Sequence, residues 1–370
     1  MAMFSDILAG GDDRGLFARL HIDLPLLLGL LVLCGCGLAI LFSATEQSSG
    51  QVERQLLRLG LALGVMMGMA QIHPDYLRRL SLPLFVFGVA MLVAVAVTGE
   101  IGKGAQRWLD LGLFRFQPSE LLKLAVPMML AWFLSGAALP PSLGRILVAV
   151  IITAVPVLLI ARQPDLGTAL MVTSAAVMVL FMAGLSWRLI GLLGALAAGA
   201  APILWFLMHD YQRQRVLTFL DPQSDPLGSG YHIIQSQIAI GSGGIHGKGW
   251  FHGTQSHLEF LPERSTDFIF AVLGEEFGLI GILALLLVYL FIIFRGLYIA
   301  ARAPNSYSRL LGGAISMVFF TYLFVNTGMV VGLLPVVGVP LPLVSYGGTS
   351  LVTIMAGFGI LMSIHTSKYS

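Results

Sequence analysis

Asp267 is the residue whose type and place point most directly to chemistry. It follows Glu263 and Arg264 and stands at the start of an apolar run that continues to Phe294. Thr266 or the serine before it can cap a helix there, so we expect Asp267 in the first helical turn. The helix dipole favours its charged form, and desolvation at a bilayer edge opposes it. Asp267 could therefore serve as a general base, or it could simply be a well-placed acid at a helix start.

Two other acids lie further along the same run, at Glu275 and Glu276. On a helix, Glu275 lies roughly 12 Å beyond Asp267 along the axis. That separation is too large for two carboxylates that act on one bond. We expect Glu275 or Glu276 to pair with a cation or to line a polar cavity.

A second polar group opens another apolar run. Ser119 can cap a helix there, which puts Glu120 and Lys123 three residues apart on one helical face at membrane depth. Ionisable groups inside a span are costly, and they usually pair or line a polar cavity. The two residues could only neutralise each other, or they could form a cavity wall with Arg107 and Arg115. Asp165 has the same character, since it could cap a helix or face that cavity.

The segment 209–266 carries cations and glycines. Its cations include Arg213, Arg215 and Lys248, and Lys248 stands within the glycine-rich stretch 241–249. Glycines beside a lysine can let backbone N–H groups approach a phosphate, although plain flexible turns have the same composition. The four histidines of this segment lack tight ligand spacing, so we expect no dedicated metal site.

Residues 333–348 form an uncharged stretch that contains three prolines within eight residues. Prolines at that density cannot form a continuous helix. We expect a re-entrant or interfacial loop buried against protein, with Ser345 available for capping, or a loop with a purely structural role.

The composition excludes a water-soluble globule. Of the 370 residues, 57% are hydrophobic and 11% are charged, against roughly 25% charged in soluble domains. The apolar blocks are long enough to cross a bilayer as helices. The formal net charge of +2 gives no reason to expect a nucleic-acid partner.

We therefore expect an all-α polytopic membrane protein with a single integral-membrane domain over 1–370. An even number of spans places both termini on one side, and lysines and arginines in short loops mark that side as cytoplasmic. The segment 209–266 is then a long periplasmic loop, and 99–118 is another outer loop. The ten expected spans are 24–43, 56–72, 82–98, 119–138, 146–161, 166–184, 189–208, 268–294, 310–333 and 349–364.

Several motifs make the chain resemble the SEDS family (shape, elongation, division and sporulation), and the resemblance covers nearly its whole length. Within that family, 253–264 is similar to elongation members. One departure is Ser265, where many relatives have histidine. The motifs are Gly-Ala-Gln-Arg-Trp at 104–108, Arg-Phe-Gln-Pro-Ser-Glu at 115–120, Gln-Pro-Asp-Leu-Gly-Thr at 163–168, Leu-Pro-Glu at 261–263, Thr-Asp-Phe-Ile-Phe-Ala at 266–271, Pro-Leu-Pro at 340–342 and Ser-Tyr-Gly-Gly at 345–348.

The resemblance implies a peptidoglycan glycosyltransferase of the bacterial inner membrane that polymerises lipid II into glycan strands during cell-wall elongation. It implies that Asp267 is the essential acid, and we expect it to be the base of one inverting displacement of a lipid pyrophosphate. The partners implied are a class B penicillin-binding protein, which is a transpeptidase, and the elongation machinery. The expected substrate contacts are Arg107, Glu120, Lys123, Arg213, Arg215, Lys248, Glu263, Arg264 and Ser345.

A divalent cation, Mg²⁺ or Mn²⁺, could help to bind the pyrophosphate, although the sequence shows no clear set of metal ligands. Two other functions use the same residues. A lipid II flippase would need charges through the membrane depth and on both faces, whereas here acids and amides concentrate on the expected outer side. A non-catalytic scaffold for a transpeptidase would have no use for a charged cavity.

Overall fold

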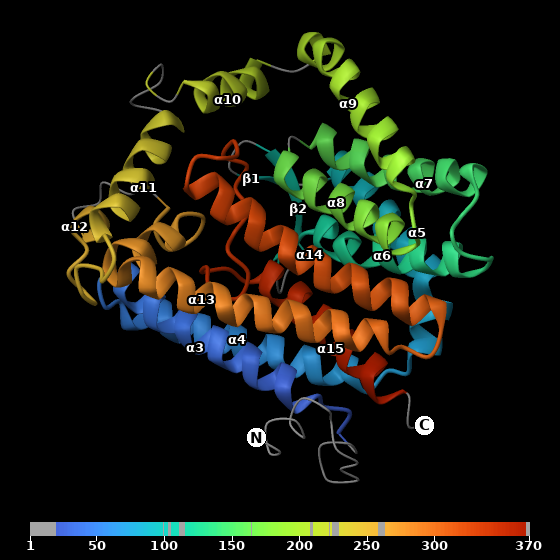
Figure 1. The fold of residues 1–370 in the computed structure, drawn as a ribbon, viewed down its shortest axis with the longest axis horizontal. Coiled ribbons are helices and arrows are strands. Elements are labelled where there is room, and N and C mark those ends of the chain that lie inside the picture. Colours follow the sequence, from blue (N-terminus) through green and yellow to red (C-terminus); the bar gives the residue numbers. More distant parts are fainter. Residues whose placement is uncertain are drawn as a thin grey trace.

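The computed structural model of the protein is helical apart from three short strands (Figure 1). It describes residues 20–98, 100–102, 105–110, 115–163, 165–207, 210–221, 223, 229–257 and 263–367. The helices are α3 (Leu24–Ala44), α4 (Ser49–Ala70), α5 (Pro74–Thr98), α6 (Pro118–Ser135), α7 (Leu143–Arg162), α8 (Leu166–Met182), α9 (Trp187–Leu207), α10 (Asp210–Leu220), α11 (Ser229–Gly243), α12 (Thr254–His257), α13 (Ile269–Ala301), α14 (Ser306–Val330) and α15 (Thr349–Thr366).

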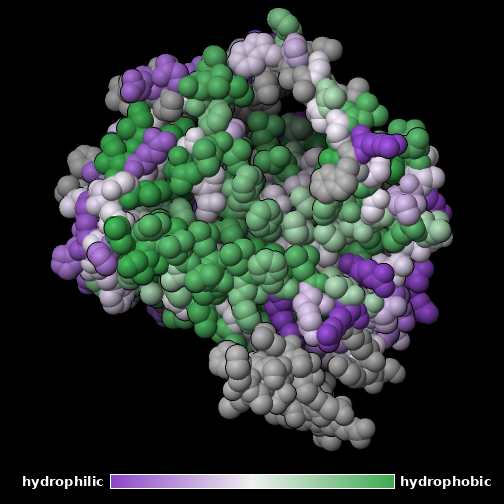
Figure 2. Space-filling model, viewed as in Figure 1, coloured by the Kyte–Doolittle hydropathy of each residue, from purple (hydrophilic) through white to green (hydrophobic). Residues whose placement is uncertain are grey.

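Each of the ten expected spans falls on one of these helices. Within the described residues, six helices are long and apolar enough to cross a membrane: α3, α5, α7, α13, α14 and α15. The apolar helix α8 is shorter, with 17 residues. Many large apolar side chains lie outward, such as Leu57, which is 71% exposed. Figure 2 shows apolar side chains over the broad middle of one face, as expected for a surface that contacts lipid.

A buried ion pair closes one end of the helix bundle. Asp23 caps α3 by accepting from the Leu26 N–H at 2.9 Å, and it also accepts from Arg295 Nη2 at 2.6 Å. His365 Nε2 lies 3.4 Å from the same carboxylate. His21 and Thr366 are hydrogen-bonded through Nδ1 and Oγ1 at 2.7 Å. The start of α3 and the end of α15 therefore lie at the same end of the bundle.

The fold is helical as expected, but the expected outer loop at 99–118 contains three short strands. Strands β1 (Glu100–Gly102), β2 (Ala105–Asp110) and β3 (Arg115–Phe116) form an antiparallel sheet in the order β1-β2-β3. Residues 99–118 lack the clear alternation of apolar and polar residues that predicts a strand. Pairing the backbone in a small sheet satisfies its hydrogen bonds next to the first residues of α6.

The expected long loop at 209–266 is also more ordered than its glycine content suggested. Its described parts form α10, α11 and α12, which lie along one edge of the molecule (Figure 1). Helix α11 packs against α13. Ser236 Oγ on α11 donates to the Val330 carbonyl at the end of α14 at 2.7 Å. These contacts hold the segment against the end of the bundle where α13 begins.

The glycine-rich stretch 241–249 packs against α13 where the helix is interrupted at Gly278. Gly278 has φ 63° and ψ −160°, so the helical hydrogen-bond pattern is interrupted there. Backbone N–H groups of Lys248 and Gly249 donate to the carbonyls of Glu275 and Glu276 at 3.0 and 2.9 Å. A Cβ on Gly247, where φ is +79°, would lie 2.1 Å from the Glu276 carbonyl oxygen. The glycines are thus needed for two backbones to cross in close contact.

We expect Gly247→Ala to destabilise the folded chain by more than about 1 kcal/mol, because the residue needs both a left-handed backbone and this close approach. The measurement is thermal unfolding of the detergent-purified protein. Gly241→Ala is the matched control, since a Cβ there meets nothing within 4 Å and alanine favours the helix. Equal melting temperatures for the two variants would contradict the described crossing.

Candidate functional site

A polar cavity of ≈ 320 Å³ lies among β2, the helices α6, α8 and α14, the start of α15 and the segment before it. It has the size of a small ligand site. It collects three stretches that the sequence singled out, at 117–123, 165–171 and 338–350. Its lining residues are Trp108, Gln117, Glu120, Lys123, Asp165, Gly167, Thr168, Met171, Tyr322, Gly338, Val339, Pro340, Gly347, Gly348, Thr349 and Ser350.

Helix α6 supplies the charged wall of this cavity. Lys123 Nζ donates to Glu120 Oε1 at 2.7 Å, and both side chains are over nine-tenths buried. The second oxygen, Glu120 Oε2, is buried and accepts no hydrogen bond from any described residue. A buried carboxylate oxygen without a donor is costly. Glu120 and Lys123 therefore neutralise each other and still leave one acceptor for a ligand.

The start of α8 forms the next part of the wall. Asp165 caps this helix, since its Oδ1 accepts from the Thr168 N–H at 3.2 Å. Its Oδ2 accepts from Gln117 Nε2 at 3.1 Å. Capping and cavity lining, which the sequence left as alternatives, are therefore both present at Asp165. The hydrogen bond to Gln117 ties α8 to the start of α6.

Asp267 lies beside this cavity and is half-buried. It lies two residues before α13, whose N-cap is Phe268, rather than inside the first turn. A Cβ built on Gly338, a residue of the cavity wall, would lie 3.5 Å from Asp267 Oδ2. The Asp267 carboxylate therefore lies next to Gly338 in the cavity wall.

Two buried side chains hold the segment around Asp267 in place. Asn326 Nδ2 on α14 donates to the carbonyls of Asp267 and Val339, at 2.9 and 2.8 Å, and Asn326 is fully buried. Ser345 Oγ donates to the Thr266 carbonyl at 2.6 Å and accepts from the Leu341 N–H at 2.8 Å. The proline-rich segment is thus bonded directly to Thr266, and Asn326 links the Asp267 carbonyl to Val339 of the same segment.

Ser345 was expected to contact substrate, but its hydroxyl is occupied by these backbone groups. Glu263 is exposed, has a left-handed backbone with φ 49°, and accepts from Thr266 Oγ1 at 2.8 Å. Arg264 Nη2 donates to Glu46 Oε1 at 2.7 Å. The described bonds of these three residues shape the turn before Asp267.

Two of the other cations expected to contact substrate, Lys248 and Arg213, bond to groups outside the polar cavity. Lys248 Nζ donates to Glu275 Oε1 at 2.7 Å, so Glu275 does pair with a cation as expected. Arg213 donates to the carbonyls of Trp205 and Phe206, both at 2.8 Å. The side chains of Arg107 and Arg215 lie outside the described part of the structure.

A histidine that the sequence did not place near Asp267 stacks on the next residue. The rings of His232 and Phe268 are 5.6 Å apart and nearly parallel. Partial burial lowers the pKa of His232 below its ordinary value, and the Glu263 carboxylate opposes that shift. Burial therefore favours the neutral imidazole of His232.

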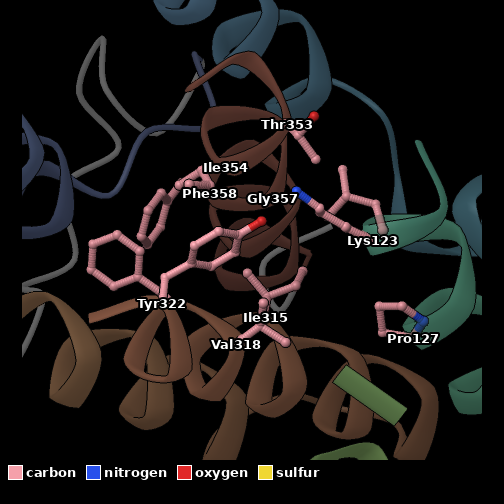
Figure 3. Close-up of a pocket in the computed structure, with 11 residues that line it drawn as sticks. Lys123, Pro127, Ile315, Val318, Tyr322, Thr353, Ile354, Gly357 and Phe358 are labelled. Atoms are coloured by element: carbon pink, nitrogen blue, oxygen red, sulfur yellow. The ribbon is translucent and has the colours of Figure 1, made fainter. Parts of the chain in front are cut away.

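Below Lys123 and Tyr322 lies a second hollow of ≈ 30 Å³, lined mainly by apolar side chains of α6, α14 and α15. It is far too small for a sugar or a phosphate. Figure 3 shows Lys123 and Tyr322 on opposite sides of this hollow, with their polar ends directed toward each other. Lys123 Nζ lies 5.4 Å from the Tyr322 ring centroid. These two residues separate the polar cavity from the apolar interior.

Sequence reasoning missed Tyr322 and the bridging role of Asn326. Tyr322 sits in an apolar run, where an aromatic residue is more often simply core. Asn326 carried a signal, because a lone amide within an apolar helix needs partners. The identity of those partners depends on tertiary contacts and cannot be read from spacing.

Comparison with known proteins identifies a family. The profile of the FtsW/RodA/SpoVE family, described as "Cell cycle protein", matches residues 17–370. The peptidoglycan glycosyltransferase MrdB of Escherichia coli K12 is 56% identical over 351 residues, which cover 95% of both chains. RodA from Thermus thermophilus has a similar structure, with a TM-score of 0.71, 28% identity, and coverage of 93% of this chain and 97% of that chain.

The fold also resembles a chain in a peptidoglycan synthase complex, whose structure is described as coordinating polymerization and crosslinking. The TM-score is 0.82 at 32% identity, and the match covers 94% of this chain and 98% of that chain.

The Lys248–Glu275 pair allows a test of whether Lys248 is structural. Lys248→Met should destabilise the chain by about 2–3 kcal/mol, because the Glu275 carboxylate is fully buried. This is less than the ~3–5 kcal/mol of a fully buried pair, because the Lys248 side chain is 26% exposed.

In the double variant Lys248→Met with Glu275→Gln, we expect most of that stability to return, as measured by thermal unfolding. Arg79→Met, an exposed cation on α5, is the control and should change little. A single Lys248→Met variant as stable as this control would show that the pair has no structural role.

Proposed function

The chain belongs to the FtsW/RodA/SpoVE family and is a peptidoglycan glycosyltransferase, and we propose that it polymerises lipid II during cell-wall elongation with Asp267 as its base. The observation that carries the proposal is the position of Asp267 Oδ2, which lies 3.5 Å from where a Cβ on Gly338, a residue of the cavity wall, would stand. A half-buried carboxylate beside a polar cavity can take a proton from a bound alcohol.

The proposed reaction is one displacement at the anomeric carbon of the donor sugar. The acceptor hydroxyl oxygen forms a bond to that carbon, and its proton passes to the Asp267 carboxylate. The bond from the anomeric carbon to the lipid pyrophosphate breaks, and the pyrophosphate leaves with the electron pair. The anomeric centre inverts, so a single carboxylate base is sufficient.

The neighbouring residues have roles in binding rather than in proton transfer. Lys123 is the cation in the cavity wall, and it can stabilise charge that develops on the pyrophosphate. The unpartnered Glu120 Oε2 can accept a hydrogen bond from a sugar hydroxyl or an amide. A buried oxygen without a hydrogen bond is unfavourable, so a ligand that donates a hydrogen bond to Glu120 Oε2 would gain binding free energy.

A divalent cation was a possible helper in holding the pyrophosphate. Among the described residues, no three His, Cys, Asp or Glu side chains converge on one point. In the cavity, the two acids are already engaged by Lys123 and Gln117. The described side chains do not form a binding site for a divalent cation, so we assign no residue as a metal ligand.

The proposal includes the membrane topology. Ten helices cross the inner membrane, both termini are cytoplasmic, and the cavity opens to the periplasm. The joining of α3 and α15 at one end, with Asp267 at the start of α13 near the other, supports this arrangement. We also propose a class B penicillin-binding protein as partner, consistent with the similar chain found in a peptidoglycan synthase complex.

Asp267→Asn should lower lipid II polymerisation by about 10²–10⁴-fold, because the amide cannot take up the proton. The assay uses the full chain with its transpeptidase partner in detergent, and moenomycin silences other polymerases. Glycan chains are measured on gels. Asp75→Asn is the control, since this acid is exposed in the first turn of α5.

Polymerisation by Asp267→Asn at the normal rate would refute the base assignment. A wild-type chain that moves lipid II across vesicle bilayers without polymerising it would support a flippase. A wild-type chain with neither activity, alone or with its partner, would leave only a scaffold.

Asn326→Leu should lower kcat by about tenfold to 10²-fold and leave KM nearly unchanged, because Asp267 loses the donor that fixes its backbone. The control is Thr327→Val, which removes a hydroxyl bonded only within α14 at 2.8 and 3.4 Å. Steady-state kinetics with lipid II separates the two parameters. A variant that folds and retains the wild-type kcat would show that Asn326 does not position the base.

A further inference from the structure

The Ser-Tyr-Gly-Gly turn at 345–348 borders the cavity, and the cation Arg58, from helix α4, lies beside it. The guanidinium carbon of Arg58 on α4 lies 4.5 Å from the Tyr346 ring centroid. Its Nε would lie 3.6 Å from a Cβ built on Gly348, which lines the polar cavity. Arg58 therefore lies at the edge of the proposed active site, although the sequence places it within an apolar helix.

Helix α4 is fastened to this turn by a second side chain. Gln55, one helical turn before Arg58, is buried and accepts from the Gly347 N–H at 3.4 Å. It also donates to the Ser345 carbonyl at 3.4 Å. The position of Arg58 against the turn is therefore set by packing and hydrogen bonds, and not only by its own flexible side chain.

The charge of Arg58 is not balanced by a carboxylate among the described residues. Lys123, Lys248 and Arg264 each contact an acid, at 2.7 Å in every case. Arg58 has only the ring of Tyr346 as a described partner. A cation at membrane depth without an acid is costly unless it faces a polar cavity or an anionic ligand.

There is space for a ligand next to this cation. A Cβ on Gly347 would meet nothing within 4 Å, and the nearest atoms to a Cβ on Gly348 belong to Arg58. Glycines without side-chain neighbours allow an anion to approach the backbone closely. On the other side, α4 presents apolar side chains to the lipid, with Leu57 71% and Leu61 63% exposed. Arg58 thus stands between the lipid phase and the cavity.

We propose that Arg58, together with the Gly347–Gly348 turn, binds the pyrophosphate of a polyprenyl-linked substrate or product. This inference rests on the proposed function, and it names a contact that the sequence did not suggest. The planar guanidinium offers several N–H donors in a fork that matches two phosphate oxygens. Stacking on Tyr346 holds that fork in one plane. Lys123 on α6 and Arg58 on α4 would then act on the pyrophosphate from two different helices.

The test measures binding and catalysis separately. Farnesyl pyrophosphate, farnesyl phosphate and farnesol are titrated against the full chain in detergent, and KM and kcat are measured with lipid II. The arginine variants are Arg58→Gln and Arg58→Lys. The control is Arg79→Gln, because Arg79 is also stacked on a tyrosine, 6.0 Å from the Tyr76 centroid, but on another helix.

We expect Arg58→Gln to weaken farnesyl pyrophosphate binding by about tenfold, the usual effect of losing one charge-assisted contact. Farnesol binding should not change, and KM for lipid II should rise more than kcat falls. Arg58→Lys should lie between, because lysine keeps the charge without the fork. Arg79→Gln should behave as wild type in every assay.

Unchanged pyrophosphate affinity and KM in a folded Arg58→Gln variant would overturn the inference. It would also be overturned if phosphatidylglycerol displaced farnesyl pyrophosphate equally well, because the site would then bind any phospholipid headgroup. If Arg58→Gln fails to fold, the Arg58→Lys variant decides the question through its farnesyl pyrophosphate affinity. If the wild-type chain binds pyrophosphate through Arg58 but does not polymerise lipid II, the proposed function is contradicted and the Arg58 inference stands.

Discussion

The site depends on the cost of placing charged groups at membrane depth. Each such group must be paired or must face a polar hollow. Glu120 and Lys123 do both, since they pair at 2.7 Å and line the cavity. Because their net charge is zero, α6 can carry two ionised side chains in a largely apolar bundle. The unpartnered Glu120 oxygen then remains as the feature that a substrate can satisfy.

The same constraint explains how Asp267 is held. A carboxylate at the start of a membrane helix is useful only if its backbone cannot drift away from the cavity. Asn326 and Ser345 fix that backbone through two bonds, to the carbonyls of Asp267 and Thr266, and they come from two separate segments of the chain. The orientation of the Asn326 amide follows from its surroundings, because two carbonyls require its NH₂ group. The proline-rich segment thus serves as a brace for the acid and as a wall of the cavity.

Apolar block lengths predicted where helices form, because the pattern is local and the ten expected ranges all fall on helices. They could not predict β1–β3 or the crossing at Gly247, which depend on backbones distant in sequence. Glu120 and Lys123 were recognisable from their spacing on one helix. The ion pair of Lys248 could not be read from the sequence, because its partner Glu275 lies 27 residues away. Arg58 carried no signal at all until the turn at 345–348 was seen beside it.

The central claim is that Asp267 takes the proton of the acceptor sugar inside this cavity. The most direct measurement is a structure of the Asp267→Asn chain with lipid II bound. The account predicts an acceptor hydroxyl within about 2.6–3.2 Å of the residue 267 side chain, with the pyrophosphate near Lys123 and the Gly347–Gly348 turn. Sugars bound outside the cavity, or an acceptor hydroxyl that points away from residue 267, would contradict it.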